Sequence, residues 1–197
     1  MGKAAHADVF RFLKAFIESP IRTGAIAASS RELADIVSEM GGVREAKLVV
    51  EFGPGTGAIT ELILEKLARD ATFFAMEINP EFVQAVRKRF PHLRVYHDSA
   101  VNTPKYLNEL GFPCCDSVVS GLPWSSFSNQ LQDDLLDATV AALRPGGKFA
   151  TYMYLQSKLI PNGSKFRSKL EARFSRVATS RVVWKNLPPA FVYQAIK

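Results

Sequence analysis

Three glycines in five positions, directly after a short apolar run, are the first residues in this sequence whose spacing could support chemistry. The apolar run is Leu48–Phe52, the glycines are Gly53, Gly55 and Gly57, and a helical pattern begins at Ala58. Glycine adopts backbone angles that other residues avoid, and it lets a ligand lie directly against the main chain. The first turn of the following helix directs its free N–H groups toward such a ligand. The pattern therefore predicts a binding turn between a buried strand and a helix.

Acidic residues at the ends of successive predicted strands extend this candidate site. Glu51 lies near the end of the first strand, Glu77 ends the run Thr72–Glu77, and Asp98 follows the next apolar run. In parallel sheets, ligands bind beyond the carboxyl ends of the strands, so these side chains should gather at one edge. A carboxylate about 20 residues after the glycines suits the vicinal hydroxyls of a ribose. Glu77 is thus expected to hold a ribose, Ile78 to lie against an adenine, and Asp98 to accept from the adenine amino group. The alternatives are a structural turn without a ligand, a different dinucleotide site and, for Glu77, an exposed acid at the start of a helix.

Strand-like and helix-like segments alternate along most of the chain, which is typical of a parallel sheet flanked by helices. Seven strands are expected at Leu48–Phe52, Thr72–Glu77, 93–97, 116–119, 148–154, 176–184 and Ala190–Ile196. Helices are expected at 4–19, 31–40, from Ala58 onward, 82–89 and 130–143. The basic stretch 158–173 is either a solvated surface or an anion-binding flap. We therefore predict an α/β fold and a single domain over residues 1–197.

The charge of the chain favours an anionic partner. Its 197 residues carry a net charge of +6, and 47% of them are hydrophobic. Nucleic acid and acidic phospholipid both fit this charge. The only cysteines, Cys114 and Cys115, are adjacent and would not form a stabilising disulfide, which indicates a reducing compartment. Arg11 and Lys14 interrupt the N-terminal apolar run, so a signal peptide is not expected, and no stretch approaches the ~18 apolar residues of a membrane span. We therefore expect a cytoplasmic monomer.

Residues 4–19 are predicted to form an amphipathic helix that ends at Pro20. One interpretation is a helix that packs on the domain. The other is an interfacial helix at the mouth of the site, which inserts aromatic side chains into a bilayer while its basic side chains meet lipid phosphates. The residues of this predicted membrane contact are Phe10, Arg11, Phe12, Leu13, Lys14 and Phe16. The following loop of small residues, 22–30, is expected to cover a bound cofactor.

Five motifs follow one another along nearly the whole chain. They are Thr23-Gly24-Ala25-Ile26-Ala27, Glu51-Phe52-Gly53-Pro54-Gly55-Thr56-Gly57, Glu77-Ile78-Asn79-Pro80-Glu81-Phe82, Ser120-Gly121-Leu122-Pro123 and Trp184-Lys185-Asn186-Leu187-Pro188-Pro189-Ala190. The glycine loop resembles that of the class I S-adenosylmethionine-dependent methyltransferases. Together the motifs resemble the soluble bacterial phospholipid N-methyltransferase family, which converts phosphatidylethanolamine stepwise to phosphatidylcholine.

This resemblance implies a Rossmann-like seven-stranded sheet with the last strand antiparallel, over residues 43–197, and N-terminal helices over residues 1–42 that cap the active site. It implies S-adenosylmethionine as cofactor and S-adenosylhomocysteine as product. The partners it implies are a phospholipid substrate and an anionic membrane surface, to which the protein would be peripherally associated. No metal site is predicted.

The resemblance also implies roles for individual residues. The cofactor would be bound by Thr23, Gly24, Ser29, Glu51, Phe52, Gly53, Pro54, Gly55, Thr56, Gly57, Glu77, Ile78, Asp98, Ser99, Ala100 and Ser120. The predicted catalytic residues are Ser120 and Gly121, whose hydroxyl and carbonyl would accept the amine protons, and Trp124, which would hold the methylated cation by a cation–π contact. The lipid head group would contact Arg22, Tyr154, Trp184, Lys185 and Asn186.

The ribosomal RNA adenine dimethyltransferases are the alternative family. They share the glycine loop, but they carry Asn-Leu-Pro-Tyr where this chain has Ser120-Gly121-Leu122-Pro123-Trp124. They also carry a C-terminal helical RNA-binding domain. The sequence therefore favours a lipid amine over a base in nucleic acid. A small-molecule amine as acceptor, and a cofactor-binding module without catalysis, remain as further interpretations.

Overall fold

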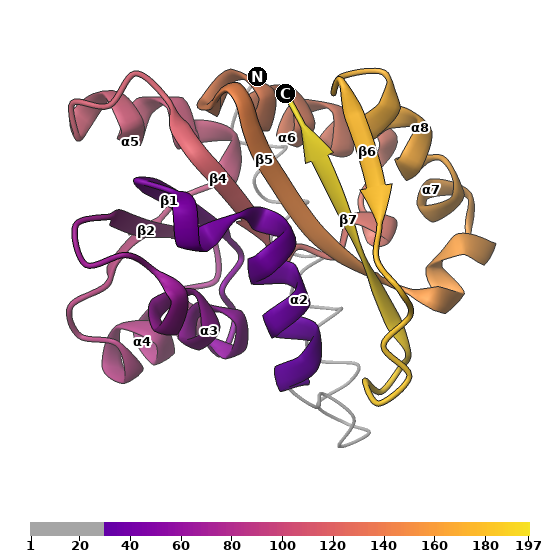
Figure 1. Cartoon of the computed structure of the whole chain (residues 1–197), viewed down its shortest axis with the longest axis horizontal. Coiled ribbons are helices and arrows are strands. Elements are labelled where there is room, and N and C mark those ends of the chain that lie inside the picture. The colour runs from indigo at the N-terminus through magenta and orange to yellow at the C-terminus, as the bar shows by residue number, and fades with distance from the viewer. Residues whose placement is uncertain (1–29) are drawn as a thin grey trace.

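The computed structural model, which describes residues 30–197, contains one seven-stranded sheet (Figure 1). Its strands are β1 (Leu48–Phe52), β2 (Thr72–Glu77), β3 (Arg94–His97), β4 (Cys115–Ser120), β5 (Leu143–Tyr154), β6 (Arg176–Thr179) and β7 (Ala190–Ile196). Their spatial order is β3-β2-β1-β4-β5-β7-β6. Strands β1 to β5 pair in parallel, and β7 is inserted antiparallel between β5 and β6. The predicted fold class is thus confirmed.

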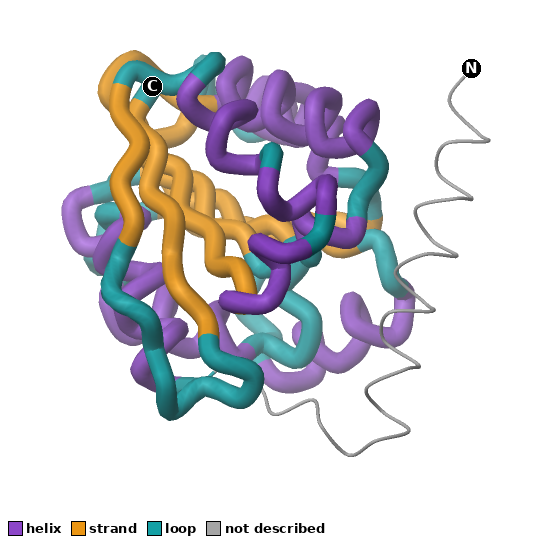
Figure 2. The backbone as a smooth tube through the Cα atoms, turned by 90° about the vertical axis from the view of Figure 1, so that its right-hand side faces the viewer, coloured by secondary structure: helices purple, strands orange, loops and turns teal. Residues whose placement is uncertain are grey.

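Helices cover both faces of this sheet (Figure 2). They are α2 (Arg31–Gly41), α3 (Ala58–Lys66), α4 (Pro80–Arg89), α5 (Thr103–Glu109), α6 (Asn129–Ala142), α7 (Pro161–Ser164) and α8 (Phe166–Glu171). Helices α2 and α3 pack on one face, and α5, α6 and α8 pack on the other. Within residues 30–197, no helix is long and apolar enough to cross a membrane.

The apolar run of β1 is buried at every position because both faces of the sheet are covered. Val49 contacts the side of α2 and α3, whereas Val50 and Phe52 point to the side of α6 and α8. This alternation follows from the two-residue period of a strand. Because β1 lies between β2 and β4, its end and the glycine loop that follows lie in the interior of the sheet and not at an outer strand.

Side-chain caps set where several helices begin. The Ser30 hydroxyl accepts from the Leu33 N–H at 3.3 Å, and the Asn79 carboxamide accepts from the Glu81 N–H at 2.8 Å. Each bond satisfies a helix N–H that has no partner within its own helix. Because Asn79 lies two residues after the end of β2, its cap places the start of α4 beside Glu77.

Three local predictions differ from the structure. The strand expected at 176–184 ends at Thr179, and beyond it only Val183 pairs with Ala190. The strand expected at 148–154 begins earlier, at Leu143, and within this extension the N–H of Gly146 donates to the Lys197 carbonyl. Helix α5 was not predicted, because its short sequence has little apolar periodicity. The helix expected at 4–19 lies outside the described residues.

The basic stretch 158–173 folds mainly as α7 and α8. Lys169 and Arg173 both contact Asp133 of α6, at 2.7 and 3.0 Å, and Arg173 also contacts Asp137 at 2.7 Å. These ion pairs hold α8 against α6. The interpretation of the whole stretch as an anion-binding flap is therefore wrong for its second half.

Candidate active site

The glycine loop joins β1 to α3 with all three glycines in the left-handed region of backbone space. Their φ angles are 67° at Gly53, 56° at Gly55 and 87° at Gly57. A Cβ on Gly53 would lie 2.7 Å from Leu122 Cδ2, and one on Gly121 would lie 2.6 Å from the Gly53 carbonyl oxygen. A Cβ on Gly55 would meet no atom within 4 Å. Gly53 and Gly121 therefore allow close packing of two loops, whereas Gly55 faces open space that a ligand can occupy.

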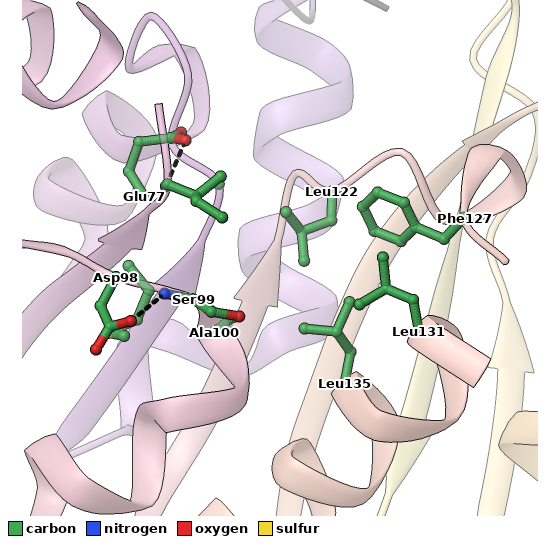
Figure 3. Close-up of a pocket in the computed structure, with 11 residues that line it drawn as sticks. Glu77, Asp98, Ser99, Ala100, Leu122, Phe127, Leu131 and Leu135 are labelled. Carbon is green, nitrogen blue, oxygen red and sulfur yellow. Dashed lines mark hydrogen bonds between the residues drawn. The ribbon is translucent and has the colours of Figure 1, made fainter. Parts of the chain in front are cut away.

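Glu77 is held rigidly at the end of β2 although it is only 6% exposed (Figure 3). Its Oε1 accepts from the N–H groups of Ile78 and Asn79 at 2.8 and 2.9 Å, and its Oε2 accepts from the Gly55 N–H at 3.2 Å. Burial raises the pKa of this carboxyl, and the three N–H donors oppose that shift. A carboxylate has about four acceptor positions, so Glu77 keeps room for a hydroxyl donor from a ligand.

Glu51 is a second buried carboxyl, with a less complete set of partners. The Thr60 hydroxyl donates to its Oε2 at 2.7 Å, and its Oε1 has no partner among the described residues. Burial raises the pKa of Glu51 to about 8, and the charge of Glu77 adds to the effect. Glu51 is thus mainly neutral at pH 7. A buried oxygen without a partner is uncommon in native proteins, but the Glu51 side chain is fully buried, so a ligand would reach it only if its neighbours moved.

A pocket with an empty volume of about 360 Å³ opens at the carboxyl ends of β1 to β4. Figure 3 shows Glu77, Asp98, Ser99 and Ala100 on one side and apolar side chains on the other. The lining residues are Gly53, Met76, Glu77, Ile78, Asp98, Ser99, Ala100, Leu122, Phe127, Leu131 and Leu135. Polar groups on one wall and an apolar wall opposite suit a nucleoside, whose sugar is polar and whose base is flat and apolar.

Asp98 is the polar group at the far end of this wall. It accepts from the Ser99 N–H at 2.7 Å, the Asn102 amide at 2.9 Å and the Tyr106 hydroxyl at 2.8 Å. Burial raises the pKa of Asp98, but these hydrogen bonds outweigh it and the net pKa is lowered. Asp98 is therefore ionised at neutral pH and available as an acceptor.

The structure brings six of the sixteen predicted cofactor residues together in one pocket, whereas Glu51, Gly55 and Ser120 do not line it. Gly53, Glu77, Ile78, Asp98, Ser99 and Ala100 line the pocket. Phe52 is buried beneath the loop, and Pro54, Thr56 and Gly57 form the loop without lining the pocket. Sequence reasoning missed Phe127, Leu131 and Leu135, although the apolar face of the helix predicted at 130–143 contains the last two.

The predicted role of Trp124 does not fit the structure. The indole is 1% exposed and packs against the rings of Phe127, Phe149 and Phe166, with centroid distances of 6.2, 5.7 and 4.9 Å. A cation–π contact needs a ring face that the cation can approach. Because Trp124 is enclosed by other aromatic rings, it belongs to the core.

Ser120 is likewise a core residue in this structure. It is fully buried, and its hydroxyl oxygen accepts from the Trp124 indole at 3.1 Å and from the Leu122 N–H at 3.3 Å. Its carbonyl accepts from the Thr151 hydroxyl at 3.0 Å. The prediction that Ser120 accepts amine protons directly is therefore corrected. Its neighbour Gly121 is partly exposed at the same strand end, next to the glycine loop.

Asn186 is also a structural residue rather than a head-group contact. It is 4% exposed, its carboxamide oxygen accepts from the Ser30 N–H at 2.9 Å, and its amide donates to the Pro188 carbonyl at 2.7 Å. Trp184 and Lys185, by contrast, are exposed on the same loop and do not line the pocket. Tyr154 lies half-buried at the carboxyl end of β5, where burial raises its pKa.

Several predicted residues lie outside the described part of the chain. They are Phe10, Arg11, Phe12, Leu13, Lys14, Phe16, Arg22, Thr23, Gly24 and Ser29. Within residues 30–197, no cluster of side chains could hold a metal ion.

Comparison with known proteins gives a match to a family model described as a methyltransferase domain, over residues 50–149. The chain is 30% identical to an ornithine lipid N-methyltransferase from Singulisphaera acidiphila over 189 residues, which cover 94% of each protein. It is 33% identical to ribosomal RNA small subunit methyltransferase A of Chlorobaculum parvum, but over only 63 residues, or 32% of this chain and 22% of the relative.

Among solved structures, an O-methyltransferase from Bacillus cereus in complex with S-adenosylhomocysteine has the same fold. It superposes with a TM-score of 0.70 at 13% sequence identity, and the superposition covers 95% of this chain and 91% of that one.

Proposed function

Because this chain belongs to the methyltransferase domain family, we propose that it transfers methyl groups to the primary amine of an amino lipid at a membrane surface. The methyl donor is S-adenosylmethionine. Phosphatidylethanolamine, which three transfers convert to phosphatidylcholine, and an ornithine lipid both present such an amine. What the two lipids share is a primary amine in the polar head group.

One observation favours a lipid acceptor over RNA. The similarity to an ornithine lipid N-methyltransferase extends over 94% of both chains. The similarity to the ribosomal RNA relative covers only a third of this chain. In addition, Ser120-Gly121 replaces the asparagine that the RNA adenine dimethyltransferases carry after their fourth strand, and Ser120 is buried. The region that would select the acceptor is therefore unlike that of the RNA enzymes.

The polarity of the pocket lining supports this donor. The donor supplies an electrophilic methyl group on a sulfonium. Glu77 would accept from a ribose hydroxyl, Asp98 would accept from the adenine amino group, and Leu122 would lie beside the base. Open space at Gly55 fits the amino-acid end. These groups already have fixed positions, so little reorganisation is needed on binding.

The acceptor amine must lose a proton before it can accept a methyl group. A primary ammonium with a pKa near ~10 costs roughly 4 kcal/mol to neutralise at pH 7. Burial beside a cation lowers this pKa, since both desolvation and like charge disfavour the ammonium. Among the described residues, the only ionisable side chains that line the pocket are Glu77 and Asp98, and we assign both to the cofactor, so the pocket offers no separate base for the amine. We therefore assign the protein a positioning role, with the proton leaving to water.

The experiment that tests this proposal offers several acceptors to one enzyme preparation. The purified chain is incubated with methyl-labelled cofactor and, separately, vesicles with phosphatidylethanolamine, vesicles with an ornithine lipid, and ribosomal RNA. Label in the organic phase with either lipid, resolved by thin-layer chromatography, is the expected result. The lipid that gains label first identifies the acceptor.

Two variants control this assay. Glu77→Ala removes the buried carboxyl, whereas Glu81→Ala removes an exposed one in the first turn of α4. Only Glu77→Ala should lose the label. Label in RNA, or no label in any lipid with an enzyme that binds the cofactor, would overturn the proposal.

A further inference from the structure

Four large apolar side chains are exposed on two segments at one edge of the sheet. Leu159 is 87% and Ile160 43% exposed at the end of the turn Leu155–Leu159, and Trp184 is 70% and Leu187 71% exposed in the loop 181–189. Elsewhere in residues 30–197, the only comparable side chain is Leu64, at 39%. Exposed apolar side chains that gather in one region mark an interaction surface.

Both segments lie at the carboxyl edge of the sheet, which is the edge that holds the pocket. The turn Leu155–Leu159 follows the end of β5 directly. The loop 181–189 connects β6 to β7, and because β6 and β5 both run antiparallel to β7, this loop leaves the sheet at the same edge. In Figure 1 it is the yellow loop that extends below β7. The N–H of Leu155 donates to the Pro189 carbonyl at 2.8 Å, so the two segments touch.

The loop 181–189 is held in place although its apolar side chains face outward. Asn186 is buried and ties the loop to Ser30 at the start of α2. Its N–H also donates to the Val183 carbonyl at 3.3 Å. With Val183 and Asn186 turned inward, Trp184 and Leu187 are presented to solvent. The exposure of these two side chains is therefore a consequence of a fixed loop conformation.

The turn Leu155–Leu159 is anchored in a similar way. The Ser125 hydroxyl donates to that of Ser157 at 3.1 Å, and the Lys158 ammonium lies 4.3 Å from the centre of the Phe191 ring. Gly163 packs so closely on this turn that a Cβ would lie 1.9 Å from the Ser157 carbonyl oxygen. Leu159 and Ile160 thus protrude from a well-packed base.

The two segments that carry these apolar residues contain basic residues and no acidic ones. The segments 155–165 and 181–189 contain no aspartate or glutamate, and they contain Lys158, Lys165, Arg181 and Lys185. Arg181 pairs with Glu32 at 2.8 Å, whereas the three lysines are exposed and make no ion pair within residues 30–197. Lysines around apolar tips, without acids, complement an anionic surface.

We propose that these two segments, 155–160 and 181–189, form a membrane-docking surface that inserts Leu159, Trp184 and Leu187 into the interface of an anionic bilayer. Tryptophan prefers the boundary between head groups and acyl chains, and lysine reaches from that boundary to the phosphates. Two separate apolar tips suit a fluid bilayer, which deforms around each of them. The surface also lies at the edge where an acceptor would enter the pocket. This inference deepens the proposed function and rests on it for its purpose.

The test uses the full chain, with Trp184 as its own reporter. Trp124 is 1% exposed, so quenching by lipids brominated on their acyl chains reports on Trp184. With vesicles of phosphatidylcholine and phosphatidylglycerol we expect a blue shift of the emission and quenching by the brominated lipid. No quenching on bound protein would overturn the proposal, because another surface would then face the bilayer.

A matched pair of variants separates the surface from general effects of charge. Leu159→Glu combined with Leu187→Glu changes one residue in each segment, and neither residue lines the pocket. This double variant should bind vesicles on the order of tenfold less tightly, because each leucine loses its apolar contact and adds a negative charge. Leu64→Glu, on α3, should bind like the wild type. For the double variant, a loss of less than about threefold, which is under 1 kcal/mol, would overturn the proposal.

Two further measurements distinguish membrane docking from misfolding and from self-association. Cofactor affinity measured by calorimetry should be equal in wild type and double variant, which shows that the fold is intact. Light scattering without lipid should give one mass for both; a larger wild-type species that the double variant lacks would assign the surface to a protein contact and overturn the proposal. Failure of the proposed function would look different. The protein would still bind vesicles, but no lipid would gain label, not even a short-chain lipid that is monomeric in solution.

Discussion

At the scale of single residues, the two buried carboxyls of the site are held in different ways. Glu77 accepts three backbone N–H bonds, whereas Glu51 accepts one hydroxyl and leaves an oxygen without a partner in residues 30–197. Backbone donors fix a carboxylate in one orientation at the moment of binding. Glu77, which lines the pocket, is therefore suited to orient a ligand, whereas Glu51 is enclosed by the protein.

Replacement of Glu77 should abolish most of the cofactor affinity. Loss of a fixed, charged acceptor for a ribose hydroxyl costs on the order of 2–3 kcal/mol, which is roughly 30- to 150-fold in the dissociation constant. Calorimetry of Glu77→Ala, with Glu81→Ala as the exposed control, measures this loss. Glu77→Gln keeps an acceptor oxygen and should lose less. If folded Glu77→Ala binds the cofactor as the wild type does, Glu77 does not contact it.

The raised pKa of Glu51 predicts an unusual pH dependence of the free energy of unfolding. Its folded pKa of about 8 lies above its ordinary value of 4.5, so the folded state keeps a proton that the unfolded state has released. Its contribution to the free energy of unfolding is therefore favourable below about pH 4.5 and is lost as pH rises toward about 8. Across that window the loss is on the order of a few kcal/mol.

The variant Glu51→Gln should remove this dependence, since an amide does not titrate. Thermal unfolding without cofactor should show that the variant gains stability relative to the wild type between about pH 5.5 and about pH 8.5. Any pH-independent change in stability that the amide causes cancels when the difference between the two proteins is compared at the two pH values. Parallel pH curves for both proteins would show that Glu51 titrates normally in the folded state.

At the scale of elements, the parts of the site that follow strand ends were predictable from the sequence. Buried strands reveal themselves as apolar runs, and a parallel sheet gathers the residues that follow them at one edge. The glycine loop, Glu77 and Asp98 were placed correctly for this reason. Strand β6 was predicted too long, because the apolar residues 182–184 belong to a loop that is fixed by the buried Asn186 rather than by sheet pairing.

Aromatic residues after β4 were harder to assign. Trp124 lies after the end of a strand, as a ligand contact would. However, it belongs to the turn Trp124–Ser126, and its side chain is buried in the core. Its ring then completes a cluster with Phe127, Phe149 and Phe166. A sequence pattern identifies the element that a side chain belongs to, but it does not give the direction of a side chain in an irregular turn.

Trp124 should therefore act on stability rather than on the course of methylation. Trp124→Ala should cost about 3–5 kcal/mol of unfolding free energy because it leaves a large cavity, and Trp124→Phe should cost less. Chemical denaturation measures both. With the variants still folded, the ratio of mono-, di- and trimethylated lipid should equal that of the wild type. A selective loss of the later transfers would restore the cation–π role.

At the scale of the whole molecule, two regions of the chain combine basic residues with large apolar residues. The described part presents Leu159, Trp184 and Leu187 at the carboxyl edge of the sheet. The N-terminal stretch 4–19, outside the described residues, has the apolar and basic pattern of an interfacial helix. Two contacts on one protein reinforce each other, because the first raises the effective concentration of the second at the surface.

A double-mutant cycle tests whether these regions act together. The four proteins are the wild type, Phe10→Glu with Leu13→Glu, Leu159→Glu with Leu187→Glu, and the combination of all four changes. If both regions contact one bilayer, each pair should weaken sedimentation with anionic vesicles, and the combination should abolish it. High salt should weaken the wild type only in part, since salt screens the lysines but not the apolar contacts. If the N-terminal pair has no effect on vesicle binding in any background, the stretch 4–19 packs on the domain, and the carboxyl edge alone holds the enzyme on its substrate surface.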